Sequence, residues 1–369
     1  MSGTRWIFVT GATGLIGRNV LARLLSADTR LRAFALVRHP DAWSRTAREL
    51  GGDGRVIPVT GDLRADGLCL TPNVRSAICR HVTAIVHLAA DTTFSNPLDR
   101  ARAVNTDGTR RVLELAHECT SPAHVAYVST AFVAGRRTGV IAEDIASVDS
   151  GWVNAYEQSK CEAERLVAAH APSWVILRSS TVVCDGRGGR VTQVNAVHRA
   201  LRLYHRGLVA MMPSAVGSSV DVVTTEYVAD AVARLALRDD AQRRVVHLCA
   251  GANALPFEEL LDITYERWAT DADWRRRNIE RPALTDLPTY ALFERTVEQI
   301  ADPSIRRLTR ALSHFVPQLA LPKRFETTNA DTLLGYHAPA VREFWRPMLD
   351  SLLADRTAGT SSSRAERAA

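Results

Sequence analysis

The stretch Trp6-Ile7-Phe8-Val9-Thr10-Gly11-Ala12-Thr13-Gly14-Leu15-Ile16-Gly17 decides how this chain is expected to fold. A short apolar run typical of a buried strand leads into a glycine-rich turn, and residues 15–26 continue with helical spacing. Gly11 permits the turn off the strand, Gly14 lets the backbone approach a pyrophosphate, and Gly17 permits close helix packing. Because N–H groups at a helix start attract negative charge, we favour a dinucleotide site over a plain turn. Its predicted residues are Gly11, Thr13, Gly14, Leu15, Ile16 and Gly17.

Strand-like and helix-like segments continue to alternate through the first half of the chain. The predicted strands, short and mostly rich in Val, Ile, Leu or Ala, are Trp6–Thr10, Leu31–Val37, Val56–Thr60, Ala84–Leu88, Val125–Ser129 and Trp174–Leu177. The helical patterns between them lie near 15–26, 41–50, 73–81, 98–119 and 154–170. Alternation of this kind requires right-handed crossovers and a parallel sheet covered on both faces. The predicted fold is α/β, a Rossmann-type doubly wound parallel sheet.

The second half of the chain predicts a smaller, mainly helical C-terminal substrate lobe. Two further strands, Val220–Val223 and Val245–Ala250, flank a helix at 225–237 and return to the first domain. Beyond residue 251 we expect helices without intervening strands, at Pro256–Thr270, Thr289–Ile300, Pro303–Val316 and Pro339–Leu353. The expected division is a cofactor-binding domain at 1–185 with 220–250, a substrate-binding lobe at 186–219 and 251–355, and a disordered tail at 356–369.

Composition narrows the classes of function. Hydrophobic residues make up 46% and charged residues 23% of the 369 residues, which is typical of a folded globular protein. The six cysteines are scattered without zinc-ligand spacing, so no metal site is expected. No apolar run reaches the roughly 20 residues of a membrane span, and the first strand begins too early for a signal peptide. We therefore expect a cytoplasmic protein with no membrane span.

The basic residues are unusual in kind. The net charge is 46 − 40 = +6, and only Lys160 and Lys323 are lysine, which leaves 46 − 2 = 44 arginines. These arginines are interspersed with acids and do not gather into patches with aromatic residues, so no nucleic-acid partner is expected. Such a background means that each single arginine carries little information, whereas Lys160 is different, because a compact ammonium can do what a planar guanidinium matches poorly.

Segments after the second, third and fourth strands predict which dinucleotide binds. The second strand ends in Val37-Arg38, and an arginine there favours a ribose 2′-phosphate, hence NADPH (NADP+) over NADH. An alternative is that Arg38 is one more surface arginine. Asp62 is placed to accept from the adenine amino group, next to Leu63. Ala89 and Ala90 leave room for the cofactor's phosphate and ribose, and a buried Asn105 could brace a neighbouring strand or the active-site lysine through water.

Catalysis is predicted from Tyr156-Glu157-Gln158-Ser159-Lys160 together with Ser129-Thr130 at the end of the fifth strand. Residues i and i+4 share one helix face, so Tyr156 and Lys160 project together. The ammonium is expected to lower the pKa of the phenol and to bond the nicotinamide ribose. Thr130 is expected to hold a substrate carbonyl while Tyr156 moves the proton.

These motifs resemble the extended short-chain dehydrogenase/reductases over roughly residues 5–250. Four segments resemble more narrowly the branch that contains thioester reductase domains and fatty acyl-CoA reductases. They are His87–Asp91, Val128–Gly135, Tyr156–Glu164 (YEQSKCEAE), and Val220–Val223 before Tyr227–Asp230. Arg178-Ser179-Ser180 and Thr224-Thr225 depart from the branch, which usually has Arg-Pro-Ser and a proline there.

The resemblance implies a Thr130-Tyr156-Lys160 triad and an NADPH-dependent reduction of an acyl thioester to an aldehyde, with further reduction to an alcohol open. The acyl group would arrive on a carrier protein or as a CoA ester. A second interpretation is an NAD(P)-dependent dehydrogenase, epimerase or dehydratase acting on a nucleotide sugar, a sterol or another alcohol or ketone. A third is a non-catalytic dinucleotide sensor, which would not need the triad. The acyl chain and the oligomeric state stay open.

Overall fold

A large parallel sheet dominates the computed structural model, which describes residues 4–145, 150–300 and 302–365. Within those residues the sheet has seven strands in the order β12-β7-β5-β4-β1-β2-β3, all paired in parallel. The strands are β1 (Arg5–Thr10), β2 (Leu31–Val37), β3 (Val56–Thr60), β4 (Val82–His87), β5 (His124–Thr130), β7 (Ser173–Ser179) and β12 (Arg244–Leu248). The predicted doubly wound sheet is therefore confirmed.

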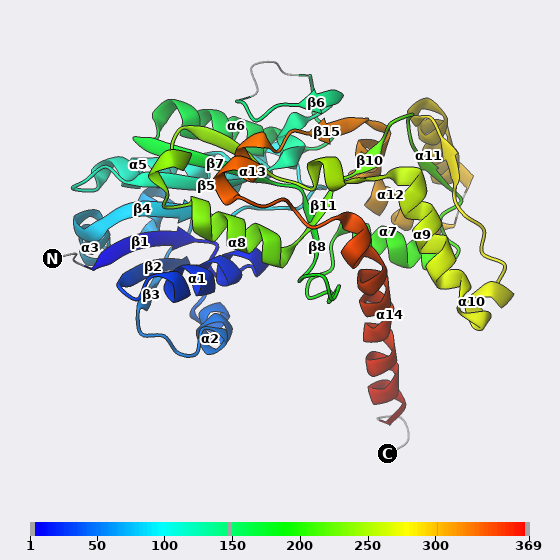
Figure 1. Cartoon of the computed structure of the whole chain (residues 1–369), viewed down its shortest axis with the longest axis horizontal. Coiled ribbons are helices and arrows are strands. Elements are labelled where there is room, and N and C mark those ends of the chain that lie inside the picture. Colours follow the sequence, from blue (N-terminus) through cyan, green and yellow to red (C-terminus); the bar gives the residue numbers. More distant parts are fainter. Residues whose placement is uncertain (1–3, 146–149, 301, 366–369) are drawn as a thin grey trace.

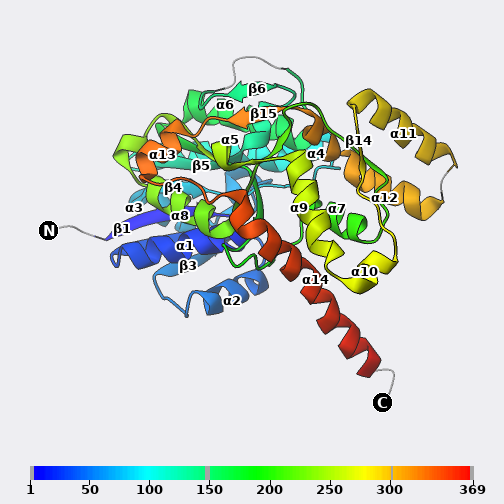
Figure 2. The same cartoon turned by 45° about the vertical axis from the view of Figure 1, so that its right-hand side comes forward.

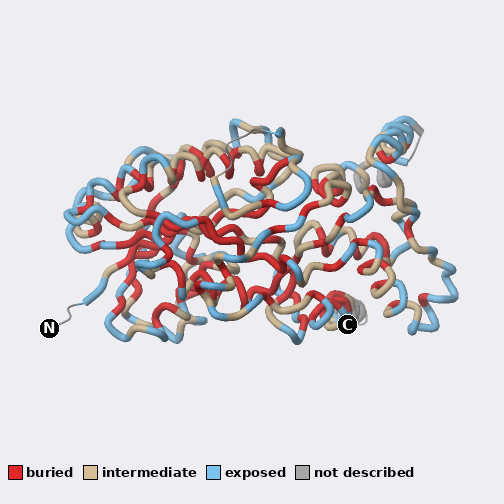
Figure 3. Tube along the Cα trace, turned by 45° about the horizontal axis from the view of Figure 1, so that its top comes forward, coloured by how far each residue is buried: buried red, intermediate tan, exposed pale blue. Residues whose placement is uncertain are grey.

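Helices cover both faces of the large sheet (Figure 1). α1 packs against α8 on one face, whereas α4 and α5 both pack against α6 on the other. The bounds are α1 (Leu15–Ala27), α2 (Pro40–Glu49), α3 (Pro72–His81), α4 (Leu98–Asn105), α5 (Asp107–Glu118), α6 (Ala155–His170) and α8 (Thr225–Leu235). Short 3₁₀ turns add η1 (Asp66–Cys69), η2 (Ala131–Ala134) and η3 (Asp239–Ala241). Buried residues run along the strands between these two layers (Figure 3).

The strand order reverses between β1 and β4, which is where a doubly wound sheet leaves a crevice at its carboxyl edge. The chain leaves β1 at Gly11, which has a φ of +72°. A Cβ at Gly11 would lie 2.6 Å from the Ala89 nitrogen, directly after β4. A Cβ at Gly17 would lie 2.1 Å from the Gly11 carbonyl oxygen. These two glycines therefore bring β1, β4 and α1 together at the crevice.

The segment predicted as one helix at 98–119 is two. α4 ends at Asn105 and α5 begins at Asp107, with Thr106 between them. The Thr106 hydroxyl donates to the Ser159 carbonyl oxygen of α6 at 3.1 Å. Because the side chains at the junction are bonded to other elements, the axis changes there although the apolar spacing continues.

The C-terminal lobe is mainly helical, but the expectation that it has no strands is wrong. Its short strands pair with segments far away in the sequence: β13 with β10, β14 with β9, and β15 with β6. Two or three residues carry no measurable period, so hydrophobic spacing did not reveal them. The predicted strand at 220–223 is likewise split into β10 and β11, and β11 pairs with β8. The short strands are β6 (Gly139–Ile141), β8 (Thr181–Cys184), β9 (Met211–Pro213), β10 (Ser219–Val220), β11 (Val222–Thr224), β13 (Leu255–Pro256), β14 (Ala283–Thr285) and β15 (Lys323–Phe325).

Figures 1 and 2 place α7, α9, α10, α11 and α12 together at the end of the molecule away from β1, β2 and β3. The bounds are α7 (Ala196–His205), η4 (Gly251–Asn253), α9 (Phe257–Ala269), α10 (Ala272–Arg276), α11 (Leu287–Ile300), α12 (Pro303–Ser313), η5 (Val316–Ala320), α13 (Thr328–Leu334) and α14 (Val341–Ala365). The sequence pattern had not predicted α7 or α13.

Two segments do not follow the predicted division of the chain. Residues 323–334 were expected in the substrate lobe, yet β15 pairs with β6 and α13 packs against β12 and α8. The expected disordered tail at 356–369 is helical as far as Ala365, and 366–369 lie outside the described residues. No proline follows Pro347 in this stretch, so no residue there lacks a backbone N–H.

Candidate active site

The turn after β1 presents free backbone donors at the crevice. Gly14 precedes α1 without a side-chain cap, and the first turn of α1 has no acidic residue. Leu15 and Ile16 in that turn are half-buried, as is Thr13 before it. The first N–H groups of an α-helix have no partner within the helix, and the helix dipole favours an anion beside them. This uncapped N-terminus fits a pyrophosphate, so the residues present suit a dinucleotide.

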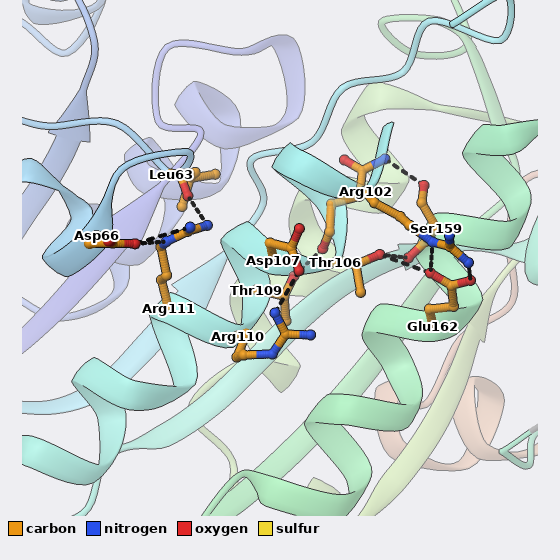
Figure 4. A network of polar contacts seen from close by, with 11 residues as sticks. Leu63, Asp66, Arg102, Thr106, Asp107, Thr109, Arg110, Arg111, Ser159 and Glu162 are labelled. Atoms are coloured by element: carbon orange, nitrogen blue, oxygen red, sulfur yellow. Dashed lines mark hydrogen bonds and ion pairs between the residues drawn. The ribbon is translucent and has the colours of Figure 1, made fainter. Parts of the chain in front are cut away.

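Arg38 and Asp62 lie close to each other beyond β2 and β3. Arg38 is exposed, and its charge helps to lower the pKa of Asp62, which falls to about 2. The largest cause of that shift is the hydrogen bond from Arg64, whose Nη2 lies 2.7 Å from Asp62 Oδ2. Asp62 is therefore already paired, which leaves less capacity for the expected adenine contact. Leu63 is buried, and its carbonyl oxygen accepts from Arg111 (Figure 4).

Asn105 braces the loop that carries Ala89 and Ala90 against α6. Its Oδ1 accepts from Asp91 N at 2.8 Å, and its Nδ2 donates to Asp91 O and to Ser159 Oγ. Its partners are therefore a loop residue and a residue of α6, and neither a strand nor Lys160 is in direct contact with the Asn105 side chain amide in these hydrogen bonds. Figure 4 shows the same junction tied by Thr106 and by the Arg102–Glu162 ion pair. Ala89 and Ala90 are half-buried at the crevice.

Tyr156 and Thr130 come together at the carboxyl end of β5. Tyr156 lies in the first turn of α6, is 8% exposed, and has its pKa raised to about 12 by burial. A hydrogen bond with the Thr130 side chain acts in the opposite direction, and the charge of Glu157 adds to the rise. Thr130 is itself the last residue of β5, and its Oγ1 accepts from Phe132 N. The two hydroxyls therefore lie next to each other at the end of β5.

Lys160 lies four residues after Tyr156 on α6, and its side chain points towards the sheet. Its Nζ donates to the Val128 carbonyl oxygen at 2.9 Å and lies 4.1 Å from the centre of the Tyr127 ring. Burial lowers the pKa of Lys160 to about 7, and Glu164 opposes that shift. The causes of the raised Tyr156 pKa do not include Lys160, so the expected lowering of the phenol pKa is not found.

A cluster of aromatic side chains that the sequence did not single out borders Tyr156. The Phe94 ring centre lies 5.3 Å from that of Tyr156, and Phe132 and Phe315 lie 6.2 and 6.5 Å from Phe94. The three come from the loop after β4, from η2 and from the residue before η5. Only Phe132, next to the Thr130 motif, carried a sequence signal.

Two adjoining cavities begin at Phe315. One is lined almost entirely by apolar side chains, among them Leu201, Met212, Leu260, Phe315 and Trp345. The other also contains polar groups. Both are lined by Val197, Val220, Phe315 and Leu319. The Thr130 and Tyr156 hydroxyls thus lie beside an aromatic wall that continues into an apolar space.

Three further residues of the sequence motifs, Glu164, Arg178 and Asp221, form buried contacts around the site. Glu164 accepts from Arg178 at 2.7 Å, and both side chains are almost completely buried. Arg178 also bonds the Asp144 carbonyl oxygen and His247. Asp221 accepts from the backbone of Ala250 and Gly251, which joins the β10–β11 corner to the chain after β12. These groups position backbone and do not face the hydroxyl pair.

The glycine turn lies at the switch point of a parallel sheet, and this arrangement defines the fold as a dinucleotide-binding one of the Rossmann type. The family model described as "Male sterility protein" matches residues 9–232. The chain belongs to that family.

Individual relatives agree with this assignment. The chain is 23% identical to the Arabidopsis thaliana protein named "Probable fatty acyl-CoA reductase 5", over 78% of this chain and 75% of that one. Matches to other fatty acyl-CoA reductases of insects and plants cover only 33% to 35% of those proteins. In these matches the chain therefore corresponds to only about a third of the relative's length.

Solved structures share the fold. The terminal R domain from the myxalamid PKS-NRPS biosynthetic pathway has a TM-score of 0.77 at 24% identity, covering 97% of this chain and 92% of that domain. Yeast methylglyoxal/isovaleraldehyde reductase Gre2, complexed with NADPH, has a TM-score of 0.63 at 13% identity, over 95% and 99%. Among the described residues no helix has the length and apolar character to cross a membrane.

Proposed function

We propose that this chain reduces an acyl thioester, carried by CoA or by a carrier protein, to an aldehyde and onward to an alcohol with NADPH. The observation that carries the proposal is the continuity from Tyr156 through Phe94 and Phe315 into an apolar cavity. The apolar lining of that cavity suits an apolar acyl chain, and the thioester carbonyl would then lie beside the hydroxyl pair. The cavity walls come largely from 186–219 and 251–355, the proposed substrate lobe.

The cofactor assignment follows from the crevice. Gly11, Thr13, Gly14, Leu15, Ile16 and Gly17 would hold the pyrophosphate at the start of α1. Arg38 would pair with a 2′-phosphate, and Asp62 and Leu63 would border the adenine. Ala89, Ala90 and Asn105 would shape the passage to the nicotinamide, and Tyr156 and Lys160 would bond its ribose. The bound cofactor supplies the hydride for the carbonyl carbon.

The side chains of the chain itself have distinct parts in the proposed mechanism. Thr130 and Tyr156 donate hydrogen bonds to the thioester carbonyl oxygen and stabilise the negative charge that grows there. Tyr156, which is neutral at physiological pH as a tyrosine with an ordinary or a raised pKa is, then supplies the proton. The hemithioacetal loses its thiol to leave the aldehyde, and the same two donors serve a second reduction.

The deciding experiment measures NADPH oxidation by the purified chain against matched substrates. The panel contains acyl-CoA esters, acyl-carrier thioesters, aldehydes and nucleotide sugars. We expect oxidation with thioesters and aldehydes and none with nucleotide sugars. Turnover of sugars alone would exclude the thioester reaction, and the thiol released identifies the bond that breaks.

A further inference from the structure

The second lysine of the chain is also buried, and it lies close to the reactive hydroxyls. Lys323 is 9% exposed on β15, and its Nζ donates to the Gly135 carbonyl oxygen and to Gln318 Oε1. Gly135 follows η2 directly, and η2 begins at the residue after Thr130. One bond of the ammonium therefore holds the turn that leaves Thr130.

The other bond leads to the residue after Tyr156. Gln318 Nε2 donates to Glu157 Oε1 at 2.7 Å, and Glu157 is 1% exposed. The same carboxylate accepts from Val153 N and from Asn154 Nδ2, so it holds the first turn of α6. Lys323, Gln318 and Glu157 form a continuous polar bridge between the Thr130 turn and the Tyr156 helix.

The two ends of this polar bridge, the Glu157 carboxylate and the Lys323 ammonium, carry opposite charges. Burial raises the pKa of Glu157 and lowers the pKa of Lys323 to about 8, and each partner's charge opposes the shift of the other. Arg136 also faces both groups, and Arg137 faces Lys323. Removing one ion of a buried pair leaves the other uncompensated, which costs more than removing both. A compact ammonium can also serve two acceptors that converge on one point, which a planar guanidinium matches poorly.

We propose that Lys323 and Gln318 are positioning residues that fix the Thr130 and Tyr156 hydroxyls relative to each other. The inference rests on the proposed function, because those hydroxyls are assigned to the substrate carbonyl. Neither residue needs to touch the substrate for this role. A displacement of about 1 Å in a reacting group can cost on the order of a hundredfold in rate.

The main test compares Lys323→Met with Arg324→Met, an exposed neighbour on the same strand. Turnover is expressed per cofactor-binding site, so that loss of folded protein does not count. We expect Lys323→Met to lower kcat about tenfold or more, with Kd for NADPH and KM for the acyl thioester changed less than about twofold. Arg324→Met should match the wild type. An unchanged kcat in Lys323→Met overturns the proposal.

A rescue experiment distinguishes positioning from general stability. Lys323→Met combined with Glu157→Gln removes both buried charges, and we expect a higher kcat than in Lys323→Met alone. Losses that simply multiply would show that the two residues act separately and would contradict the polar bridge. If Lys323→Met does not fold, Gln318→Met breaks the same connection while keeping both ions, and the same kcat criterion applies.

Hydrogen exchange separates this inference from the proposed function. If the wild type reduces no thioester and no aldehyde, the proposed function fails. The polar bridge is then judged by amide exchange of residues 131–135 and 153–158. We expect faster exchange in both segments of Lys323→Met than of Arg324→Met. Equal exchange in the two variants overturns the bridge itself.

Discussion

The turn after β1 and the cavity beside Phe315 are built from very different lengths of chain. Gly11, Gly14 and Gly17 shape the turn within seven residues, and their effect follows from backbone sterics alone. The cavity wall instead joins Phe94, Phe132 and Phe315, which meet only after the C-terminal lobe has packed. The shape of the predicted cofactor turn is thus determined by residues that are close in the sequence, whereas the shape of the predicted substrate cavity depends on contacts between residues far apart in the sequence.

The largest effect is expected at Tyr156, where the two regions meet. Tyr156→Phe removes the proposed proton donor and should lower kcat by about 10² to 10⁴. The Kd for NADPH should stay within a small factor of the wild type, because the glycine turn is untouched. Steady-state NADPH oxidation and fluorescence titration measure the two values. Tyr265→Phe, at a more exposed tyrosine, is the control, and equal loss in both would remove Tyr156 from the mechanism.

A smaller effect confined to the cofactor side is expected at Arg38. Arg38→Asp replaces a partner of the 2′-phosphate with a repelling carboxylate, which should lower the NADPH-to-NADH preference about 10- to 100-fold. The ratio of kcat/KM for the two cofactors measures this. Arg80→Asp, an exposed arginine on α3, should leave the ratio unchanged. An unaltered ratio in Arg38→Asp would show that Arg38 is one more surface arginine with no role in the choice of cofactor.

On the substrate side, Ala200→Trp should fill part of the apolar cavity, which Ala200 lines. We expect kcat/KM for long acyl chains to fall about tenfold, since a change of a few methylenes is worth that much in a hydrophobic pocket. The shortest acyl thioester is the internal control and should react as in the wild type. An equal loss for all chain lengths would place the acyl chain elsewhere.

The smallest expected effect is that the Tyr156 phenol does not titrate in the pH range of an ordinary tyrosine. The pKa of Tyr156 is raised to about 12, so its phenol stays neutral through the range in which an ordinary tyrosine ionises, near pH 10. The difference in tyrosinate absorbance between wild type and Tyr156→Phe should therefore show no step below about pH 10.5 in the cofactor-free protein. A step near pH 8 would instead mean that Lys160 lowers the phenol pKa without the cofactor.

Hydrophobic spacing predicted the strands of the large sheet because each is five to seven residues long and all but the edge strand β3 are largely buried. It could not predict β13, β14 and β15, which are too short to show a period and exist only through pairing with distant partners. Thr130, Tyr156 and Lys160 were predicted as site residues from a motif. Their catalytic roles stay predictions.

The aromatic wall could not be predicted, because Phe94 and Phe315 are 221 residues apart, from 315 − 94, and no local pattern joins them. Lys323 is different, since a signal for it was present. In a chain with two lysines, the scarcity that marked Lys160 applied equally to Lys323. It was missed because no short motif surrounds it and its partners Gly135 and Gln318 converge only in the folded state.

The burial of both lysines has a consequence for reactivity. Lys160 and Lys323 are all the lysines of the chain, and neither presents its amine at the surface. Aldehydes and thioesters are electrophiles that accessible primary amines attack, which gives an imine and water with the former and an amide and a thiol with the latter. The guanidinium groups that cover this protein stay protonated and resist both reactions. A chain that releases such electrophiles would therefore offer them no exposed lysine amine to modify.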